Sequence, residues 1–284
     1  MVGAHVRRQH VEYARRRGLS CRRACALVRV ARSSLRYKSC RALKDAPVAQ
    51  RMRELAAQYP RYGYRRVRIF LGREGHVMGP ERAHRLWCQA GLQVPRRRSR
   101  RRVAPSRPRP LPPTGPNQVW AYDFVFDTVA TGQQIKCLTV IDEWTREALA
   151  IDVAGSIRSG RVIDVLSRLV SVRGAPRYLR SDNGPEFVSA AVLRWVVSAG
   201  IETVHIAPGK PWQNGTDESF NGKLRDECLS LEWFRTRREA AAIIETWRKH
   251  YNEVRPHSSL DYLTPNEFRA KQMTIQHQIG TASL

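Results

Sequence analysis

Two segments determine the interpretation of this chain: RSDNGPEF at residues 180–187 and PGKPWQNGTDESFNGKLRDECL at residues 208–229. The first places Asp182 directly before an Asn-Gly pair, which predicts a tight turn at the end of a short strand. The second places Glu218 in the first turn of a predicted helix, and thirty-five residues separate the two acids. Taken singly, each acid has an ordinary structural explanation, as a turn residue or as a helix N-terminal acid. With Asp123, in QVWAYDFVFD at residues 118–127, they could form a three-carboxylate metal site.

The sequence around these segments predicts a mixed α/β sheet covered on both faces. Three stretches of strand-forming residues with short connections predict a meander, and helices then alternate with strands. The predicted strands are residues 119–128, 134–142, 147–155, 177–181 and 202–207, and the predicted helices are residues 159–173, 187–200, the segment carrying Glu218, and 236–254.

The first predicted strand contains two acids that could be the metal ligand. Asp123 and Asp127 point to the same face, but four residues of strand separate them by about 13 Å. Both can hardly bind one metal cluster, so one of them is structural, and alternation alone does not say which. Downstream, Asp142, Thr145 and Arg146 predict a capped turn in which Arg146 can pair with Asp142.

The helix that carries Glu218 also predicts a distinct functional face. Glu218 shares a face with Gly222 and Arg225, whereas Phe220, Leu224 and Leu231 fall toward the core. The adjacent acid, Asp217, points more than a quarter-turn away.

Carboxylates that converge in this way suit phosphodiester chemistry. Cutting or transferring a phosphodiester requires an activated oxygen nucleophile and a stabilised leaving oxygen, and two magnesium ions roughly 4 Å apart supply both. Magnesium takes hard oxygen ligands and keeps several waters, so a few carboxylates suffice.

The charge distribution predicts the substrate. The net charge is +25, and the 30 Lys and Arg against 5 Asp and Glu of residues 1–110 account for all of it. A basic block beside a neutral one is typical of nucleic-acid binding.

The basic block reads as two helical regions and a linker. Residues 1–45 predict a helix-turn-helix-like segment with Ser20 and Ser33 as helix caps, and residues 46–95 predict a second such domain that binds DNA. Residues 96–116 are an Arg- and Pro-rich linker that could itself lie along a DNA backbone. The phosphate-contact candidates of this block are Arg65, Arg66, Arg68, Arg82, Arg85, Arg97 and Arg98.

Cysteines and hydropathy exclude other classes. A zinc site built from Cys21, Cys25, His5 and His10 is conceivable, but two cysteines four apart on a helical pattern more often pack as small apolar residues. Unpaired cysteines, with neither a signal peptide nor an apolar run long enough for a membrane span, indicate a cytoplasmic, nucleoid-associated protein.

Three motifs carry a family resemblance: WAYDF around Asp123, RSDNGPEF around Asp182, and the long segment around Glu218. With RYGYRRV at residues 61–67 and YNEVRPHSSL and TPNEF within residues 251–268, the chain resembles the second-reading-frame (orfB) transposase of the insertion-sequence-three family. The resemblance covers nearly the whole chain. It also includes the thirty-five-residue spacing.

The resemblance implies a ribonuclease-H-like, retroviral-integrase-like catalytic core at residues 117–271, followed by a tail at residues 272–284. It implies Asp123, Asp182 and Glu218 as the catalytic ligands of two Mg²⁺ or Mn²⁺ ions, and so favours Asp123 over Asp127. The DNA-contact candidates near the glutamate are Lys210, Trp212, Gln213, Asn214, Asn221, Lys223 and Arg225.

The expected function is that of a DNA transposase, which cuts element ends and transfers the freed 3′ hydroxyl to another phosphodiester without a covalent protein–DNA intermediate. The expected partners are terminal inverted repeats, target DNA, further copies of this chain, and an upstream-frame protein as a fusion or a separate subunit. The alternative is a non-catalytic DNA-binding product of a decayed element, and an RNA-cutting hydrolase is a weaker third option.

Overall fold

The computed structural model describes residues 3–37, 40–93, 112–181, 189–205 and 215–281. The chain forms two compact units, Met1–Tyr59 with Phe70–Gln93, and Pro60–Ile69 with Val94–Leu284. The N-terminal helices are α1 (Ala4–Arg16), α2 (Cys21–Val28), α3 (Arg32–Arg36), α4 (Arg41–Gln58), α5 (Tyr64–Arg73) and α6 (Pro80–Gln89).

The helices of the basic block follow the predicted pattern with two corrections. Ser20 caps α2 as predicted, but Ala31 precedes α3 as its cap, so Ser33 lies inside the helix and the prediction of a Ser33 cap was wrong. Helix α4 begins at Arg41 and contains Pro47, so the predicted boundary between residues 45 and 46 falls within it. Proline removes one backbone donor, and the carbonyl it would have paired with belongs to the exposed Leu43 and can be hydrated.

The second unit is built on a five-stranded sheet of order β3-β2-β1-β4-β5. Its strands are β1 (Val119–Thr128), β2 (Gln134–Asp142), β3 (Ala148–Ala154), β4 (Tyr178–Ser181) and β5 (Glu202–His205). β1 pairs antiparallel with β2, and β2 with β3, whereas β4 runs parallel to β1 and β5 parallel to β4. The predicted meander and mixed sheet are therefore confirmed.

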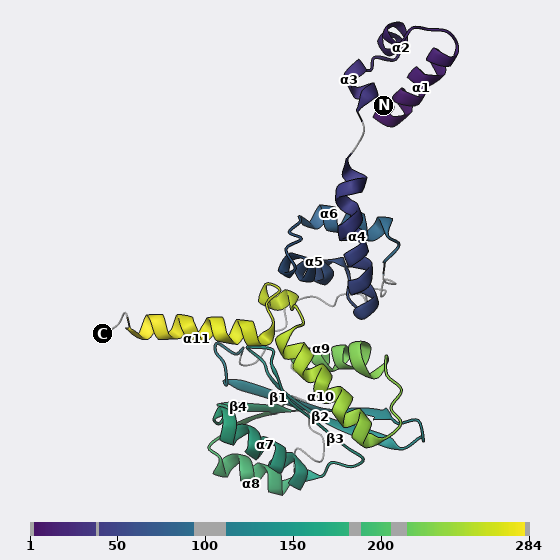
Figure 1. Cartoon of the computed structure of the whole chain (residues 1–284). Coiled ribbons are helices and arrows are strands. Elements are labelled where there is room, and N and C mark those ends of the chain that lie inside the picture. Colours follow the sequence, from purple (N-terminus) through teal and green to yellow (C-terminus); the bar gives the residue numbers. More distant parts are fainter. Residues whose placement is uncertain (1–2, 38–39, 94–111, 182–188, 206–214, 282–284) are drawn as a thin grey trace. The chain divides into compact units, whose positions relative to one another are not determined.

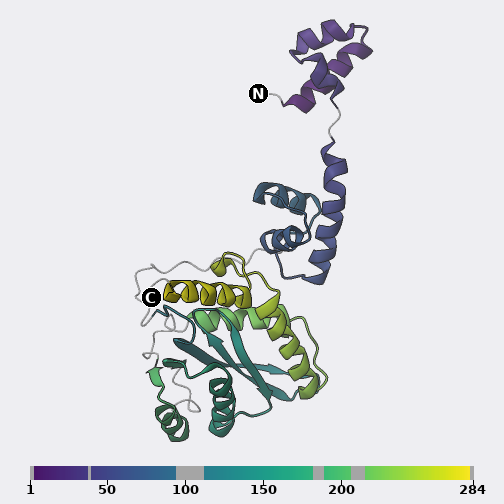
Figure 2. The same ribbon diagram turned by 60° about the vertical axis from the view of Figure 1, so that its left-hand side comes forward.

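Helices cover both faces of this sheet, as Figures 1 and 2 show. Helices α7 (Ser159–Arg173) and α8 (Ala190–Ser198) pack on one face, over a core that includes Trp120, Tyr122 and Leu138. Helices α9 (Gly215–Leu224) and α10 (Arg237–Glu253) pack on the other, over Ala121 and Val125. Because successive side chains of a strand point to opposite faces, the odd-numbered positions of β1, Asp123 among them, lie on the α9 side.

Helix α9 continues directly into a π turn, Arg225–Leu229, closed by a bond from Ser230 N to Arg225 O of 2.8 Å. Phe220 and Leu224 are buried as predicted, but Leu231 lies beyond the π turn and is 43% exposed, so the prediction of a core position for Leu231 was wrong. A short 3-10 turn, Ser258–Leu260, precedes α11 (Pro265–Thr281).

Helix α11 starts with a reciprocal capping box. Thr264 Oγ1 accepts from Glu267 N at 3.1 Å, and Glu267 Oε2 accepts from Thr264 N at 2.7 Å. With Pro265 in the first helical position, the TPNEF motif is therefore a helix-start signal. In the described part of the chain, no helix combines the length and apolar character that a membrane crossing requires.

Candidate active site

Asp123 lies in the middle of β1, opposite Thr139 of β2, on the face that α9 covers. Its carboxylate is held at both oxygens. Phe124 N donates to Oδ1 at 2.7 Å, and Asn221 Nδ2 of α9 donates to Oδ2 at 2.8 Å. The side chain is therefore fixed in one orientation and remains partly accessible.

Asn221 connects the strand to the helix. It is buried, and its Oδ1 lies 3.2 Å from the hydroxyl oxygen of Thr139, which also lies 3.1 Å from the carbonyl oxygen of Asp123. Sequence reasoning placed Asn221 among the DNA contacts, whereas the structure directs its side-chain amide to a carboxylate. The helical spacing could have indicated this role, because Asn221 lies about one turn after Glu218 on the same helix.

Glu218 stands in the first turn of α9 and is exposed, as the predicted helical face requires. The preceding acid, Asp217, is fully buried. One turn of α9 therefore presents Glu218 to solvent and its neighbour Asn221 to Asp123. The carboxylates of Asp123 and Glu218 offer the hard oxygen ligands that magnesium prefers.

Asp182 lies outside the described residues, directly after β4, which ends at Ser181. Within the described ranges, no three His, Cys, Asp or Glu side chains are grouped so as to hold a metal ion. The strand that leads to Asp182 is anchored by an internal ion pair. Arg180 Nη1 donates to both carboxylate oxygens of Glu143 at 2.8 Å, and both side chains are 0% exposed.

Several arginines proposed as DNA contacts have partners within the protein. Arg82 and Arg85 both bond the carboxylate of Asp45, each at 2.7 Å, and lower the pKa of that carboxyl. Arg66 donates to Glu227 at 3.1 Å. Arg65 and Arg225 are exposed and Arg68 is half-buried. The remaining DNA candidates, Arg97, Arg98, Lys210, Trp212, Gln213 and Asn214, lie outside the described residues.

The turn between β2 and β3 directs Arg146 to α9. Asp142 Oδ1 accepts from the backbone N–H groups of Trp144 and Thr145, so the predicted capped turn is present. Arg146 adopts a left-handed backbone with φ of 62°, and its guanidinium donates to Thr216 Oγ1 at 2.8 Å. Arg146 pairs with Asp142 through its backbone, whose N–H donates to the Asp142 carbonyl oxygen at 2.9 Å, but its guanidinium bonds Thr216 instead of the Asp142 carboxylate.

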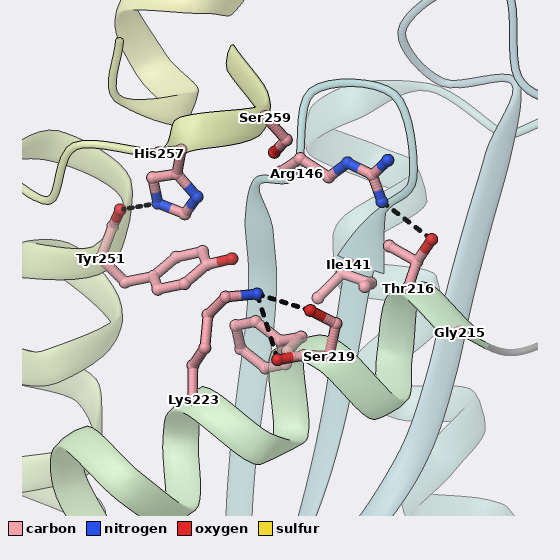
Figure 3. Close-up of a pocket in the computed structure, with 10 residues that line it drawn as sticks. Ile141, Arg146, Gly215, Thr216, Ser219, Lys223, Tyr251, His257 and Ser259 are labelled. Carbon is pink, nitrogen blue, oxygen red and sulfur yellow. Dashed lines mark hydrogen bonds between the residues drawn. The ribbon is translucent and has the colours of Figure 1, made fainter. Parts of the chain in front are cut away.

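Arg146 and Lys223 line a cavity of about 310 Å³ beside α9, drawn in Figure 3. Thr216, Ser219 and Lys223 come from α9, Tyr251 from α10, and His257 and Ser259 from the segment that follows. Lys223 Nζ donates to the carbonyl and hydroxyl oxygens of Ser219 at 3.1 and 2.8 Å. Sequence reasoning singled out YNEVRPHSSL but assigned no role to its side chains.

Positive charge dominates around this cavity. Burial, followed by the charge of Arg255, lowers the pKa of Lys223 to about 8, and the charges of Arg66 and Arg146 act in the same direction. Glu227 opposes them, but Arg255 holds it through two hydrogen bonds of 2.6 Å. Burial and Arg255 also lower the pKa of His257 to about 2, so its imidazole is neutral.

Comparison with known proteins shows which domain families the chain contains. Residues 113–211 and 199–265 match the integrase core domain family, and residues 42–100 match the HTH-like domain family. The insertion element IS407 uncharacterized 31.7 kDa protein of Burkholderia multivorans is 46% identical over 253 residues, 89% of this chain and 91% of its own. The IS476 uncharacterized 39.2 kDa protein of Xanthomonas euvesicatoria is 42% identical over 91% of this chain and 75% of its own.

The Escherichia coli transposase InsD for insertion element IS2 is 28% identical over 79% of this chain and 78% of its own. The catalytic core domain of HTLV-2 integrase in complex with magnesium overlaps 55% of this chain and 98% of its own, with 17% identity and a TM-score of 0.43.

The second unit thus has a ribonuclease-H-like integrase core, defined by its strand order and by the matched domain family. The helical region matched as HTH-like, residues 42–100, draws on both units. The chain belongs to the insertion-sequence-three family of insertion-element proteins, as a second-reading-frame (orfB) product. This membership supports a transposase or integrase function.

Proposed function

We propose that the chain is a metal-dependent DNA transposase. Water attacks a phosphodiester at each end of the insertion element and frees a 3′ hydroxyl. At the same active site this hydroxyl attacks a phosphodiester of the target DNA, and the new bond forms as the bond to the target's 3′ oxygen breaks. The observation that carries this proposal is the hydrogen bond from Asn221 to Asp123, because it couples the strand acid to the helix that presents Glu218. A DNA-binding protein without catalytic activity does not need such an arrangement.

Asp123, Asp182 and Glu218 are the residues that would hold the metal, as two Mg²⁺ or Mn²⁺ ions. The metal, when bound, supplies activation of the attacking oxygen and stabilisation of the leaving oxygen. Asn221 acts as a positioning residue, because it fixes the rotamer of Asp123 before the metal and the substrate arrive.

The proposed partners follow from the same function. The HTH-like region and the linker bind the terminal inverted repeats. The segment containing Lys210, Trp212, Gln213 and Asn214 positions a DNA strand near the carboxylates. Several copies of the chain assemble on DNA, with the upstream-frame protein as a fusion or as a separate subunit. The protein acts in the bacterial cytoplasm on nucleoid DNA.

The test is cleavage and strand transfer of element-end DNA by the purified chain, alone and fused to its upstream frame. Asp123→Asn, Asp182→Asn and Glu218→Gln should each abolish both reactions while DNA affinity persists. A chelator should stop the reaction, and Mg²⁺ or Mn²⁺ should restore it. Full activity in any one of these variants would refute the assignment of that residue. Binding without cleavage by the fused wild-type protein would indicate a regulatory DNA-binding product instead.

Asn221→Leu tests the positioning role separately. It keeps a similar volume and removes the amide that donates to Asp123. We expect kcat to fall by one to two orders of magnitude, a higher metal concentration for half-maximal activity, and unchanged DNA affinity. Asn221→Gln, which retains a donor on a longer side chain, should lose less. Equal kcat and equal metal dependence in wild type, Asn221→Leu and Asn221→Gln would contradict the role.

A further inference from the structure

The cavity in Figure 3 lies on a different side of α9 from the carboxylate site. Thr216, Ser219 and Lys223 follow one another at spacings of three and four residues, so they form one stripe along the helix. Glu218 and Asn221 lie on nearly the opposite side of the helix, and Asn221 faces Asp123. Phe220 and Leu224, which pack into the core, lie between the two sides. The cavity is therefore a second site, separate from the one that contains Glu218.

The charges around the cavity suit an anion. The charges of Arg255, Arg66 and Arg146 all act on Lys223 there, and Glu227 is the carboxylate that counters them. Glu227 is itself held by both Arg255 and Arg66. Repulsion among the cations is a cost in the ligand-free protein, and a bound anion would remove part of it. Asp217 and Glu218 lie on other sides of α9, one buried and one exposed to solvent.

The cavity also presents hydrogen-bond donors from three directions. An ammonium carries three donors, and in the described part of the chain Lys223 Nζ bonds only the two oxygens of Ser219. Figure 3 shows the Tyr251 hydroxyl directed toward the same space, with Ser259 across from it. Ser219 and Ser259 are exposed, so the cavity has an open rim through which a ligand attached to a longer chain can enter.

We propose that this cavity binds one phosphate group of the DNA backbone, held by Lys223 and Arg146 with the hydroxyls of Ser219, Tyr251 and Ser259. A tetrahedral anion with several oxygens matches donors that converge from a helix, a turn and the C-terminal segment, and ammonium and guanidinium groups are the usual phosphate partners. The proposal rests on the proposed function. It adds that the YNEVRPHSSL segment forms part of the DNA-binding surface, on a different side of α9 from Glu218.

The first experiment measures the salt dependence of DNA binding by the full chain, using fluorescence anisotropy with a short labelled duplex. Each phosphate contact contributes about 0.9 to the slope of log affinity against log salt. Lys223→Met should therefore bind severalfold more weakly and with a slope about one less steep, and Lys223→Arg should restore much of both. The matched control is Lys249→Met, which removes an exposed lysine of α10 outside the cavity lining.

A slope for Lys223→Met equal to that of wild type, in a protein with the wild-type circular dichroism spectrum, would overturn the proposal. So would an equal loss in Lys249→Met, because it would show that total charge rather than the cavity determines binding. Arg146→Met provides a second variant in case the lysine substitution disturbs α9, and it should reduce the slope by a similar amount.

A second experiment identifies the source of the phosphate by acylation footprinting of Lys223 with mass spectrometric readout. Protection by the duplex at low concentration, with inorganic phosphate protecting only in large excess, supports a backbone phosphate. Protection by inorganic phosphate or pyrophosphate but not by the duplex would overturn it in favour of a small phosphorylated ligand. Protection by neither would overturn it altogether.

These outcomes are independent of the proposed chemistry. Footprinting and salt slopes report on binding, so they can be measured with Glu218→Gln protein that does not turn over. If the cavity binds duplex but wild type never cuts DNA, the transposase proposal fails and the phosphate site stands. If wild type cuts DNA and Lys223 is neither protected nor required for the slope, the cavity proposal fails alone.

Discussion

Removing Arg180 should destabilise the integrase core by about 3–5 kcal/mol, because it leaves the Glu143 carboxylate buried without its cation. Both side chains have 0% exposure, and the 2.8 Å bonds from Arg180 Nη1 reach both carboxylate oxygens. A loss of this size is a large share of the 5–15 kcal/mol that typically stabilises a domain. Arg180→Met, which keeps the length of the side chain and removes its charge, is the suitable variant.

The double variant distinguishes an ion pair from simple packing. Replacing a buried pair by apolar residues of similar volume is often neutral or stabilising by 1–4 kcal/mol. Arg180→Met combined with Glu143→Leu should therefore be markedly more stable than Arg180→Met alone. Urea denaturation followed by tryptophan fluorescence measures all four corners of the cycle. A loss below about 1 kcal/mol in Arg180→Met, or additive losses in the double variant, would refute the reasoning.

Three further predictions follow from the structure. Raising the pH from 7 to 9 deprotonates Lys223, whose pKa is lowered to about 8. The DNA affinity of wild type should therefore fall toward that of Lys223→Met in anisotropy titrations, and an affinity difference between the two proteins that stays constant with pH would contradict this. Burial raises the pKa values of Cys137 and Cys228 to about 12. A thiol reagent should therefore label the exposed Cys40 in the native protein, and should label Cys137 and Cys228 only in denaturant. Labelling of Cys137 or Cys228 in the native protein would refute their burial in the core. Thr264→Ala should cost about 1 kcal/mol of unfolding free energy through the lost helix cap, measured by thermal denaturation against Thr264→Ser, which should lose less.

The sheet and most of its helices could be predicted from the sequence because their signals are local. Alternation placed β1 and β2, and the odd-numbered face of β1 put Asp123 with Val125. Helical spacing placed Glu218 outward in the first turn of α9. Prediction failed at the start of α4, because a proline can either end a helix or be tolerated within it. Here the helix continues through Pro47, which faces solvent.

The side-chain partners could not be predicted because they are set by contacts between distant segments. Arg146 lies within four residues of Asp142, yet its left-handed backbone directs it to Thr216, seventy residues away. Asn221 bonds Asp123 across ninety-eight residues. In both cases the sequence supplied the residue type, and the packing of α9 on the sheet supplied its partner.

The π turn at Arg225–Leu229 makes the length of this segment a constraint in its own right. A π turn holds one residue more than an α turn, so refolding this turn as regular α-helix with the same number of residues would rotate everything downstream by about 100°. Glu227 would then turn away from Arg255, even though every side chain was unchanged. For chains of this family, a gap of one residue in this turn is therefore expected to convert it to regular α-helix while leaving the direction of the downstream segment nearly unchanged.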